Sequence, residues 1–147
     1  MLTLTARIDP ASAASPNLTL SLTAEQRTRS RHRFRTEEGE EVHLHLPRGT
    51  VLTDGDWLRS QPEGTIVKII AKPEPVLTVT GKIPLDLLRA AYHLGNRHVA
   101  LEVTASYLRL LPDSVLQTMI EQMGLDVQAS VQPFLPETGA YHRDHAH

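Results

Sequence analysis

Histidines are the side chains of this 147-residue sequence whose type and spacing could do chemistry. Two of the eight, His93 and His98, lie in the segment YHLGNRH, on either side of a glycine. The chain has no cysteine, so a bound metal ion would have to be held by imidazole, carboxylate, backbone or water. Binding of a divalent transition-metal ion is therefore the first chemistry to consider.

His98 is predicted to lie at the start of a strand, on its polar face. In the segment HVALEV, Val99, Leu101 and Val103 occupy one face, and His98 and Glu102 lie on the other. If two copies of the chain paired through these faces, two such imidazoles could meet across a twofold axis and share one ion. An ordinary surface histidine would produce the same pattern, and the spacing by itself favours that interpretation.

Two other positions have simpler interpretations. His93 is predicted in the last turn of a helix, where a histidine interacts favourably with the helix dipole without any ligand; it remains a possible secondary metal ligand. His43 and His45 share one face of a predicted strand and could chelate an ion. Because no further ligand is near them in the sequence, we interpret them as exposed residues of a one-sided sheet.

The C-terminal stretch ETGAYHRDHAH contains three more histidines, His142, His145 and His147, together with Asp144. Such local enrichment is typical of a metal-catching arm. A solvated tail that contains histidines by chance is the alternative. The sequence predicts His142, His145 and His147 as auxiliary metal ligands.

A second unusual stretch, RTRSRHRFR, places an arginine at every other position from residue 27 to 35. An extended chain would project all five guanidinium groups from one side, as a ridge able to bind an acidic protein or phosphate, with Arg29, Arg31 and Arg33 as its centre. The acidic run EEGEE at residues 37–41 favours another interpretation, in which it folds back as a hairpin partner and neutralises the ridge.

Composition and the remaining motifs exclude several functional classes. The 15 basic and 17 acidic residues nearly balance, so no overall field favours nucleic acid or a membrane, and aromatic residues are only 4% of the chain, which weakens base stacking. No apolar stretch is long enough to span a membrane, and the first 15 residues do not show a basic leader followed by an apolar block, so a cytoplasmic location is expected. No phosphate-binding loop, nucleophile elbow or carboxylate pair stands out, and an enzyme is not predicted.

The elements that must position these residues fall into two groups. Residues 1–72 read as short strands, at 3–9, 18–23, 41–47 and 65–71, and predict an all-β N-terminal domain. The boundary is placed in AKPEPV, where Pro73 and Pro75 should interrupt sheet pairing.

Residues 73–136 predict a second domain of mixed type. A strand at 76–80 leads to a helix over 84–94 that Gly95 should end, then to strands at 98–103 and 106–111, a helix over 113–123 that Gly124 should end, and a strand at 125–134. This order, βαββαβ, is ferredoxin-like and leaves one sheet face open. The predicted fold class is therefore α+β, with two domains and a histidine-containing tail at 137–147.

Three segments resemble the UreE family of urease accessory proteins, which are nickel metallochaperones: TEEGEEVHLHLPRGTVLTDGDWL, AAYHLGNRHVALEV and ETGAYH. The resemblance spans nearly the whole chain. It implies a cytoplasmic homodimer with a partner- or peptide-binding N-terminal domain and a ferredoxin-like domain that pairs about the metal. It also implies that His98 is the interfacial ligand, one from each protomer.

By this resemblance the protein binds Ni(II) and delivers it for assembly of the urease active site, with Zn(II) or Cu(II) able to substitute in vitro. The implied partners are the maturation GTPase UreG and the urease apoprotein complex, and the dimer could pair again into a dimer of dimers. The alternative is a binding module for acidic protein or nucleic acid that uses the ridge at residues 27–35, with metal binding incidental.

Overall fold

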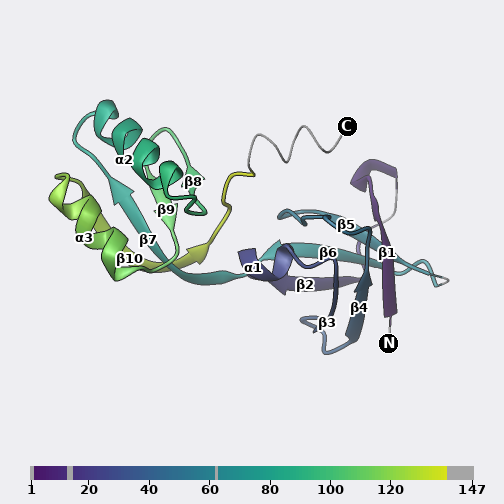
Figure 1. Cartoon of the computed structure of the whole chain (residues 1–147). Coiled ribbons are helices and arrows are strands. Elements are labelled where there is room, and N and C mark those ends of the chain that lie inside the picture. Colours follow the sequence, from purple (N-terminus) through teal and green to yellow (C-terminus); the bar gives the residue numbers. More distant parts are fainter. Residues whose placement is uncertain (1, 13–14, 62, 139–147) are drawn as a thin grey trace. The chain divides into compact units, whose positions relative to one another are not determined.

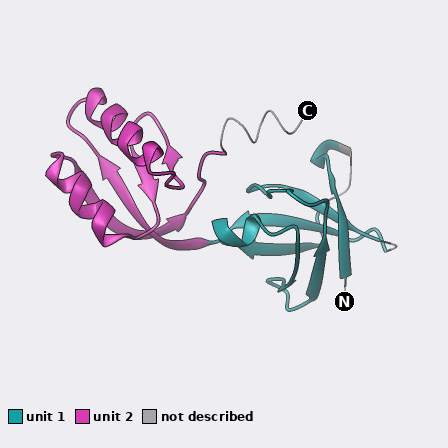
Figure 2. Cartoon of the chain, in the orientation of Figure 1, with its two compact units in different colours: residues 1–72 teal, residues 73–147 magenta. Residues whose placement is uncertain are grey.

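The computed structural model describes residues 2–12, 15–61 and 63–138. The chain divides into two compact units, residues 1–72 and residues 73–147 (Figure 2). Among the described residues, no helix is long and apolar enough to cross a membrane.

Unit 1 is a six-stranded sheet with the strand order β2-β6-β5-β1-β4-β3 (Figure 1). Strands β1 and β4 are parallel, as are β2 and β6, and the other neighbours are antiparallel. The elements are β1 (Leu2–Ile8), a 3-10 turn (Pro10–Ser12), β2 (Leu18–Leu22), α1 (Ala24–Arg27), β3 (Arg31–Arg35), β4 (Glu41–His45), β5 (Trp57–Ser60) and β6 (Ile66–Ala71).

The core of unit 1 follows from period-two alternation, which puts every second side chain of a strand on one face. In β4, Val42 and Leu44 are fully buried, whereas His43 and His45 lie on the opposite face. The prediction for this strand is confirmed. The core comprises Leu4, Leu20, Leu22, Val42, Leu44, Leu46, Leu52, Leu58, Val67 and Ile69.

The turn between β3 and β4 reaches the strand at the opposite edge of the sheet. The Glu37 N–H donates to the Thr19 carbonyl at 2.9 Å, and the Thr19 N–H donates to the Glu38 carboxylate at 3.0 Å. Gly39 has a φ of 89°, a left-handed conformation that glycine adopts without steric cost. The sheet therefore curls until this turn meets β2.

Two elements of unit 1 were absent from the sequence-based prediction. In α1, Thr23 is the N-cap and Gln26 bonds back to the Thr23 N–H, so the sequence carried an unused capping-box signal, Thr-x-x-Gln. In β5, the inward positions are Leu58 and Ser60. Ser60 is almost completely buried although it is polar, so the sequence of β5 does not show the apolar–polar alternation of a strand. The Ser60 Oγ accepts a hydrogen bond from the Thr65 N–H.

Unit 2 has the element order that the sequence predicts: strand, helix, strand, strand, helix, strand. The elements are β7 (Pro73–Thr80), α2 (Pro84–Asn96), β8 (Glu102–Val103), β9 (Leu108–Leu110), α3 (Ser114–Gln122) and β10 (Asp126–Pro133). The sheet order is β10-β7-β9-β8, with all neighbours antiparallel, and both helices lie on the same face (Figure 1). The core comprises Leu77, Val79, Ala90, Leu94, Leu101, Leu108, Leu110, Leu116, Ile120 and Leu125.

Helix α3 begins and ends as predicted. The Asp113 carboxylate accepts hydrogen bonds from the N–H groups of Val115 and Leu116, each at 3.0 Å, which satisfies two donors of the first turn. Gly124, with a φ of 91°, follows the last turn.

The prolines near the unit boundary do not interrupt sheet pairing, so that prediction is wrong. Pro73 and Pro75 both lie in β7, in register with β10. Strand β9 meets β7 only at Leu77–Val79, so on its other side the start of β7 is a sheet edge. Proline is tolerated in an edge position, because no ladder hydrogen bond is lost there.

Candidate metal centre

His98 lies in a left-handed turn that closes helix α2. Its φ is 58°, and among the described residues it is the one non-glycine residue with a positive φ. The His98 N–H donates to the Gly95 carbonyl at 3.0 Å, and the Val99 N–H donates to the Leu94 carbonyl at 3.2 Å. These two bonds form a Schellman motif, in which the left-handed position is usually glycine.

Two predictions at this site are wrong. Gly95 does not end α2, which runs on to Asn96. The predicted strand over residues 98–103 is reduced to Glu102–Val103. Leu101 belongs to the core as predicted, but Glu102 is also buried, whereas Val103 is exposed. The physical reason is packing: closing the helix at His98 lets Val99 pack against the core that contains Leu94. His98 is exposed on this turn rather than on the open face of the sheet.

Helix α2, which precedes His98, carries a stripe of exposed apolar side chains. Leu85, Leu88 and Tyr92 recur at spacings of three and four residues, which places them on one helix face, and they are 43%, 66% and 68% exposed. His93 is exposed in the last turn, with its ring centroid 5.2 Å from that of Tyr92 in an edge-to-face arrangement. An imidazole and an aromatic ring thus lie close together near the end of α2.

Within residues 2–12, 15–61 and 63–138, no three histidine or acidic side chains come together as a ready ligand set. The predicted auxiliary ligands His142, His145 and His147 lie outside the described residues. The described part of one chain therefore offers His98 and His93 as separate exposed imidazoles near the end of α2.

His43 and His45 lie side by side on the outer face of β4, with ring centroids 6.1 Å apart. Across the strand pair, His43 is in register with Arg33 and His45 with Arg31. A cationic neighbour on each side disfavours binding of a second cation. This agrees with the interpretation of both residues as part of an exposed sheet face.

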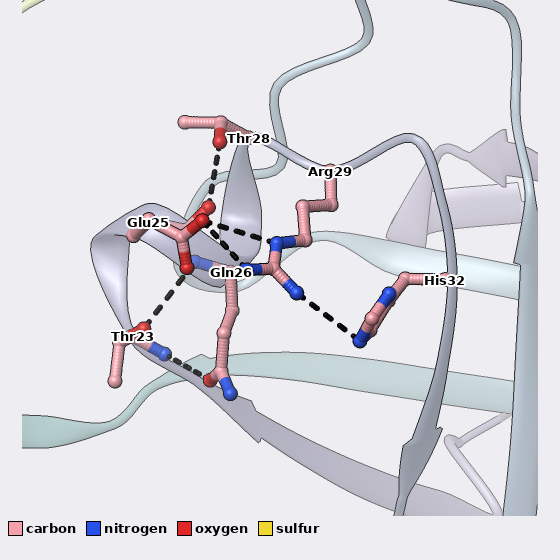
Figure 3. A network of polar contacts seen from close by, with 6 residues as sticks. All are labelled: Thr23, Glu25, Gln26, Thr28, Arg29 and His32. Carbon is pink, nitrogen blue, oxygen red and sulfur yellow. Dashed lines mark hydrogen bonds and ion pairs between the residues drawn. The ribbon is translucent and has the colours of Figure 1, made fainter.

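The predicted ridge of five arginines is only partly correct. Arg27 belongs to α1 and is 4% exposed, with its Nε donating to the Thr23 carbonyl at 3.4 Å. Arg29 is tied to Glu25 by an ion pair at 2.8 Å and donates to His32 Nε2 at 3.1 Å (Figure 3). A guanidinium group can only donate, so His32 Nε2 is the acceptor. The reason for both departures is the short helix, which replaces the extended chain on which the ridge depended.

The rest of the ridge is present on β3. Arg31, Arg33 and Arg35 are exposed at alternate positions, but most of the following acidic run forms the turn, and only Glu41 of that run lies in the partner strand β4. Arg35 pairs with Glu41 at 3.6 Å, and this is the one ion pair between the acidic run and the ridge in the described chain. Neutralisation is therefore partial, because Arg31 and Arg33 face histidines instead of carboxylates.

Glu102 is a functional candidate that sequence reasoning placed on the surface. It is 7% exposed, and its carboxylate accepts hydrogen bonds from the Tyr107 hydroxyl at 2.9 Å and from the Leu135 N–H at 2.8 Å. Arg109 lies 3.6 Å from the same carboxylate, donates to the Thr78 hydroxyl and stacks on the Tyr107 ring at 4.5 Å. The signal was the opposite charge of Glu102 and Arg109 on two strands predicted to pair, and the structure places these residues opposite each other in the hairpin of β8 and β9.

The buried Glu102 carboxylate, which accepts the hydrogen bonds of this network, changes the pKa of Tyr107. The hydrogen bond to the Glu102 carboxylate, together with burial, raises the pKa of Tyr107 above its usual 10.0, because both favour the protonated phenol. Tyr107 is therefore a stable hydrogen-bond donor throughout the neutral range.

Comparison with known proteins agrees with the sequence signature. The model of the UreE urease accessory protein N-terminal domain matches residues 4–72, and that of the C-terminal domain matches residues 74–147. The urease accessory protein UreE of a Nostoc species is 57% identical over 147 residues, covering 100% of both chains. The UreE of Thermosynechococcus vestitus is 55% identical, covering 97% of this chain and 99% of the relative, and that of Ectopseudomonas mendocina is 49% identical, covering 99% and 86%. The chain belongs to the UreE family of urease accessory proteins.

Proposed function

We propose that this urease accessory protein is a metallochaperone, not an enzyme, that binds Ni(II) as a homodimer in the cytoplasm and delivers it for assembly of the urease active site. The observation that carries the proposal is the exposed imidazole of His98 in a left-handed turn. A residue other than glycine in this conformation costs about 1–2 kcal/mol, and such residues cluster at ligand-binding sites. Metal binding by the His98 imidazole would explain why the chain has a histidine, and not a glycine, at this position.

The second subunit is the natural source of the second ligand. The apolar stripe of Leu85, Leu88 and Tyr92 is exposed on α2, the helix that the His98 turn closes. A large exposed apolar patch is a mark of an association surface, and twofold pairing would bring equivalent residues to the axis. In this proposal two chains bury their α2 stripes against each other, and the two His98 rings share one ion.

A site of few imidazoles suits a carrier. It binds a divalent ion through nitrogen and leaves coordination positions open, so the ion can leave by ligand exchange. His142, His145 and His147 would add transferable ligands, with His93 as a secondary one. Imidazole also suits Zn(II) and Cu(II), which would substitute in vitro. Because Cu(II) binds nitrogen ligands more tightly than Ni(II), selectivity for nickel would have to come from geometry, metal availability or the recipient.

The units take different roles in this proposal. Unit 2, whose strand order β10-β7-β9-β8 supports a ferredoxin-like classification, binds metal and dimerises. Unit 1 binds partners, which would be the maturation GTPase UreG and the urease apoprotein complex. Its exposed Arg31 and Arg33 supply a cationic surface for an acidic protein.

Calorimetric titration with Ni(II) tests the metal role of His98. The variant His98→Asn is suited to this, because asparagine tolerates the left-handed conformation and removes the imidazole. We expect it to lose the tightest binding event, whereas the control His45→Asn, which also removes one exposed imidazole, keeps it. Unchanged tight binding by His98→Asn would reject His98 as the ligand.

A second candidate function rests on the cationic surface formed by Arg31 and Arg33. A module for acidic protein or nucleic acid would show salt-sensitive binding that Arg31→Ser with Arg33→Ser abolishes. The double variant should meanwhile keep Ni(II) binding if metal transport is the main function. Loss of both activities would contradict the assignment of separate roles to the two units.

A further inference from the structure

Strand β3 lies at one edge of the unit 1 sheet, and most of its side chains are exposed. It ends the strand order β2-β6-β5-β1-β4-β3 and lies beside β4 (Figure 1). Within β3, Phe34 is partly buried and the other residues are exposed. An exposed edge strand offers backbone N–H and C=O groups to which a further strand can bind.

The backbone groups of β3 that face β4 belong to its even-numbered residues. The Ser30 carbonyl accepts a hydrogen bond from the Leu46 N–H at 2.9 Å, and the Thr36 N–H donates to the Glu40 carbonyl at 2.8 Å. Hydrogen-bonded and non-hydrogen-bonded positions alternate along an antiparallel pair. The odd-numbered residues between them therefore direct their N–H and C=O groups away from β4.

These outward groups belong to the arginines that remain of the ridge. In the described chain, no other segment bonds to the backbone of Arg31, Arg33 or Arg35 on that side. The Arg35 guanidinium is already paired with Glu41, whereas Arg31 and Arg33 form no ion pair with any described carboxylate. Within the part of the chain that the structure describes, Arg31 and Arg33 thus combine an open backbone edge with an unpaired positive charge.

We propose that this β3 edge, formed by Arg31 and Arg33, binds an acidic segment of a partner protein as an added antiparallel strand. Directly opposite side chains of paired strands have their Cβ atoms about 4.5–5.5 Å apart, on the same face of the sheet. A segment with a carboxylate at every second position would therefore place one opposite each arginine. Backbone hydrogen bonds supply affinity and the ion pairs select acidic sequences. The inference deepens the partner-binding role proposed for unit 1.

Charge decides against a second copy of this chain as the occupant. Two β3 strands paired edge to edge would bring the arginines of both copies opposite one another, and like charges in that position are destabilising. Charged side chains on edge strands prevent self-association in this way. An acidic strand converts the same charges into attraction, so the β3 edge excludes its own copies and accepts a complementary segment.

Titration of the metal-free full-length protein with a synthetic peptide tests the proposal. The probe has aspartate at every second position, with threonine or valine between. The control peptide has the same composition but consecutive aspartates, so an extended chain directs half of its carboxylates to the other face. We expect the alternating peptide to bind at least about threefold more tightly than the control, and its binding to weaken as salt is raised.

Amide hydrogen exchange identifies the mode of binding. Saturation with the alternating peptide should slow exchange at Arg31 and Arg33, whose N–H groups point outward. Exchange at His32 and Phe34 should change little, because their N–H groups already face β4. Peptide binding that leaves the Arg31 and Arg33 amides unprotected would overturn the addition of a strand.

Two substitutions at one position separate the charge from the backbone. Arg33→Ser removes the guanidinium group but keeps the N–H, and should weaken peptide binding by about two- to fivefold. Arg33→Pro also removes the N–H, without loss of a bond to β4, and should weaken binding at least about twofold further. The control Arg59→Ser removes an exposed arginine from β5, which is paired on both sides, and should leave the affinity unchanged.

Equal losses in Arg33→Ser and Arg59→Ser, or equal affinities for the two peptides, would overturn the proposal. A single-stranded oligonucleotide of equal charge that binds these arginines more tightly than the peptide would also overturn it, in favour of nucleic acid. Failure of the metal role gives a different result, because these titrations contain no metal. His98→Asn would then keep the tightest Ni(II) binding while the β3 edge still bound the peptide.

Discussion

The Val99 N–H donates to the carbonyl of Leu94 across a left-handed His98, so that the core contact of Val99 and the exposure of the imidazole depend on the same turn. The turn has the hydrogen bonds of a Schellman motif but lacks the glycine that usually occupies its left-handed position. His98 therefore has a left-handed backbone conformation that costs stability for any residue with a side chain.

Replacement of His98 should therefore reveal that cost. We expect His98→Gly to raise the free energy of unfolding by about 1 kcal/mol relative to His98→Ala, because glycine adopts the left-handed conformation without a Cβ clash. Both variants remove the imidazole, so metal binding does not distinguish them. Urea denaturation without metal measures the difference. Equal midpoints for the two variants would mean that the turn is unstrained.

The N-cap of α3 offers an independent test of the fold. Asp113→Ala removes the acceptor for two N–H groups and should cost about 1 kcal/mol of stability. The neighbouring Ser114→Ala changes a helical residue without touching that acceptor and serves as control. Thermal unfolding of both variants is the measurement, and a lower midpoint for Ser114→Ala than for Asp113→Ala would contradict the assignment of the cap.

The raised pKa of Tyr107 predicts a change of stability at alkaline pH. Its pKa in the folded protein is raised above the 10.0 of the unfolded chain, so its hydrogen bond to Glu102 contributes fully below about pH 10 and is lost as pH rises through the folded value. The stability advantage of the wild type over Tyr107→Phe should therefore shrink as the pH rises from about 10 through the folded pKa of Tyr107. Urea midpoints of the two proteins, measured across this range of pH, test the prediction. A stability advantage of the wild type that grows with pH would contradict it.

The apolar stripe on α2 predicts the subunit interface. Introducing a charge by Leu88→Glu together with Tyr92→Glu should reduce the protein to the mass of a single chain, because two like charges would meet across a twofold axis. Val115, which is 70% exposed on α3, provides the control Val115→Glu, which should leave the assembly intact. Sedimentation velocity separates these outcomes. An unchanged mass in the double variant would move the interface away from α2.

Periodicity and capping residues predicted much of the fold. The alternation around His43 and His45 identified the buried face of β4, and Asp113 with Gly124 located α3 almost to the residue. Both signals are local, because each depends on side chains within a few residues of the position that it predicts. The UreE resemblance, carried by the same segments, is likewise confirmed.

The site was harder to predict because its geometry depends on distant contacts. Gly95 has the local preference to end α2, but the burial of Val99 moves the left-handed residue to His98. Glu102 reads as a surface residue until Arg109 and Leu135 surround it, and Leu135 lies far along the sequence. Tertiary packing and long-range hydrogen bonds override local propensity in both cases.

The central claim is that one ion is shared by two His98 side chains, and titration with Ni(II) followed by light scattering tests it most directly. The method reports stoichiometry and assembly in the same sample. We predict that the tightest binding event saturates at one Ni(II) per two chains in a dimeric particle, and that His98→Asn, still folded, lacks this event. Saturation at one Ni(II) per chain, or the same half-integral event in His98→Asn, would contradict the shared site.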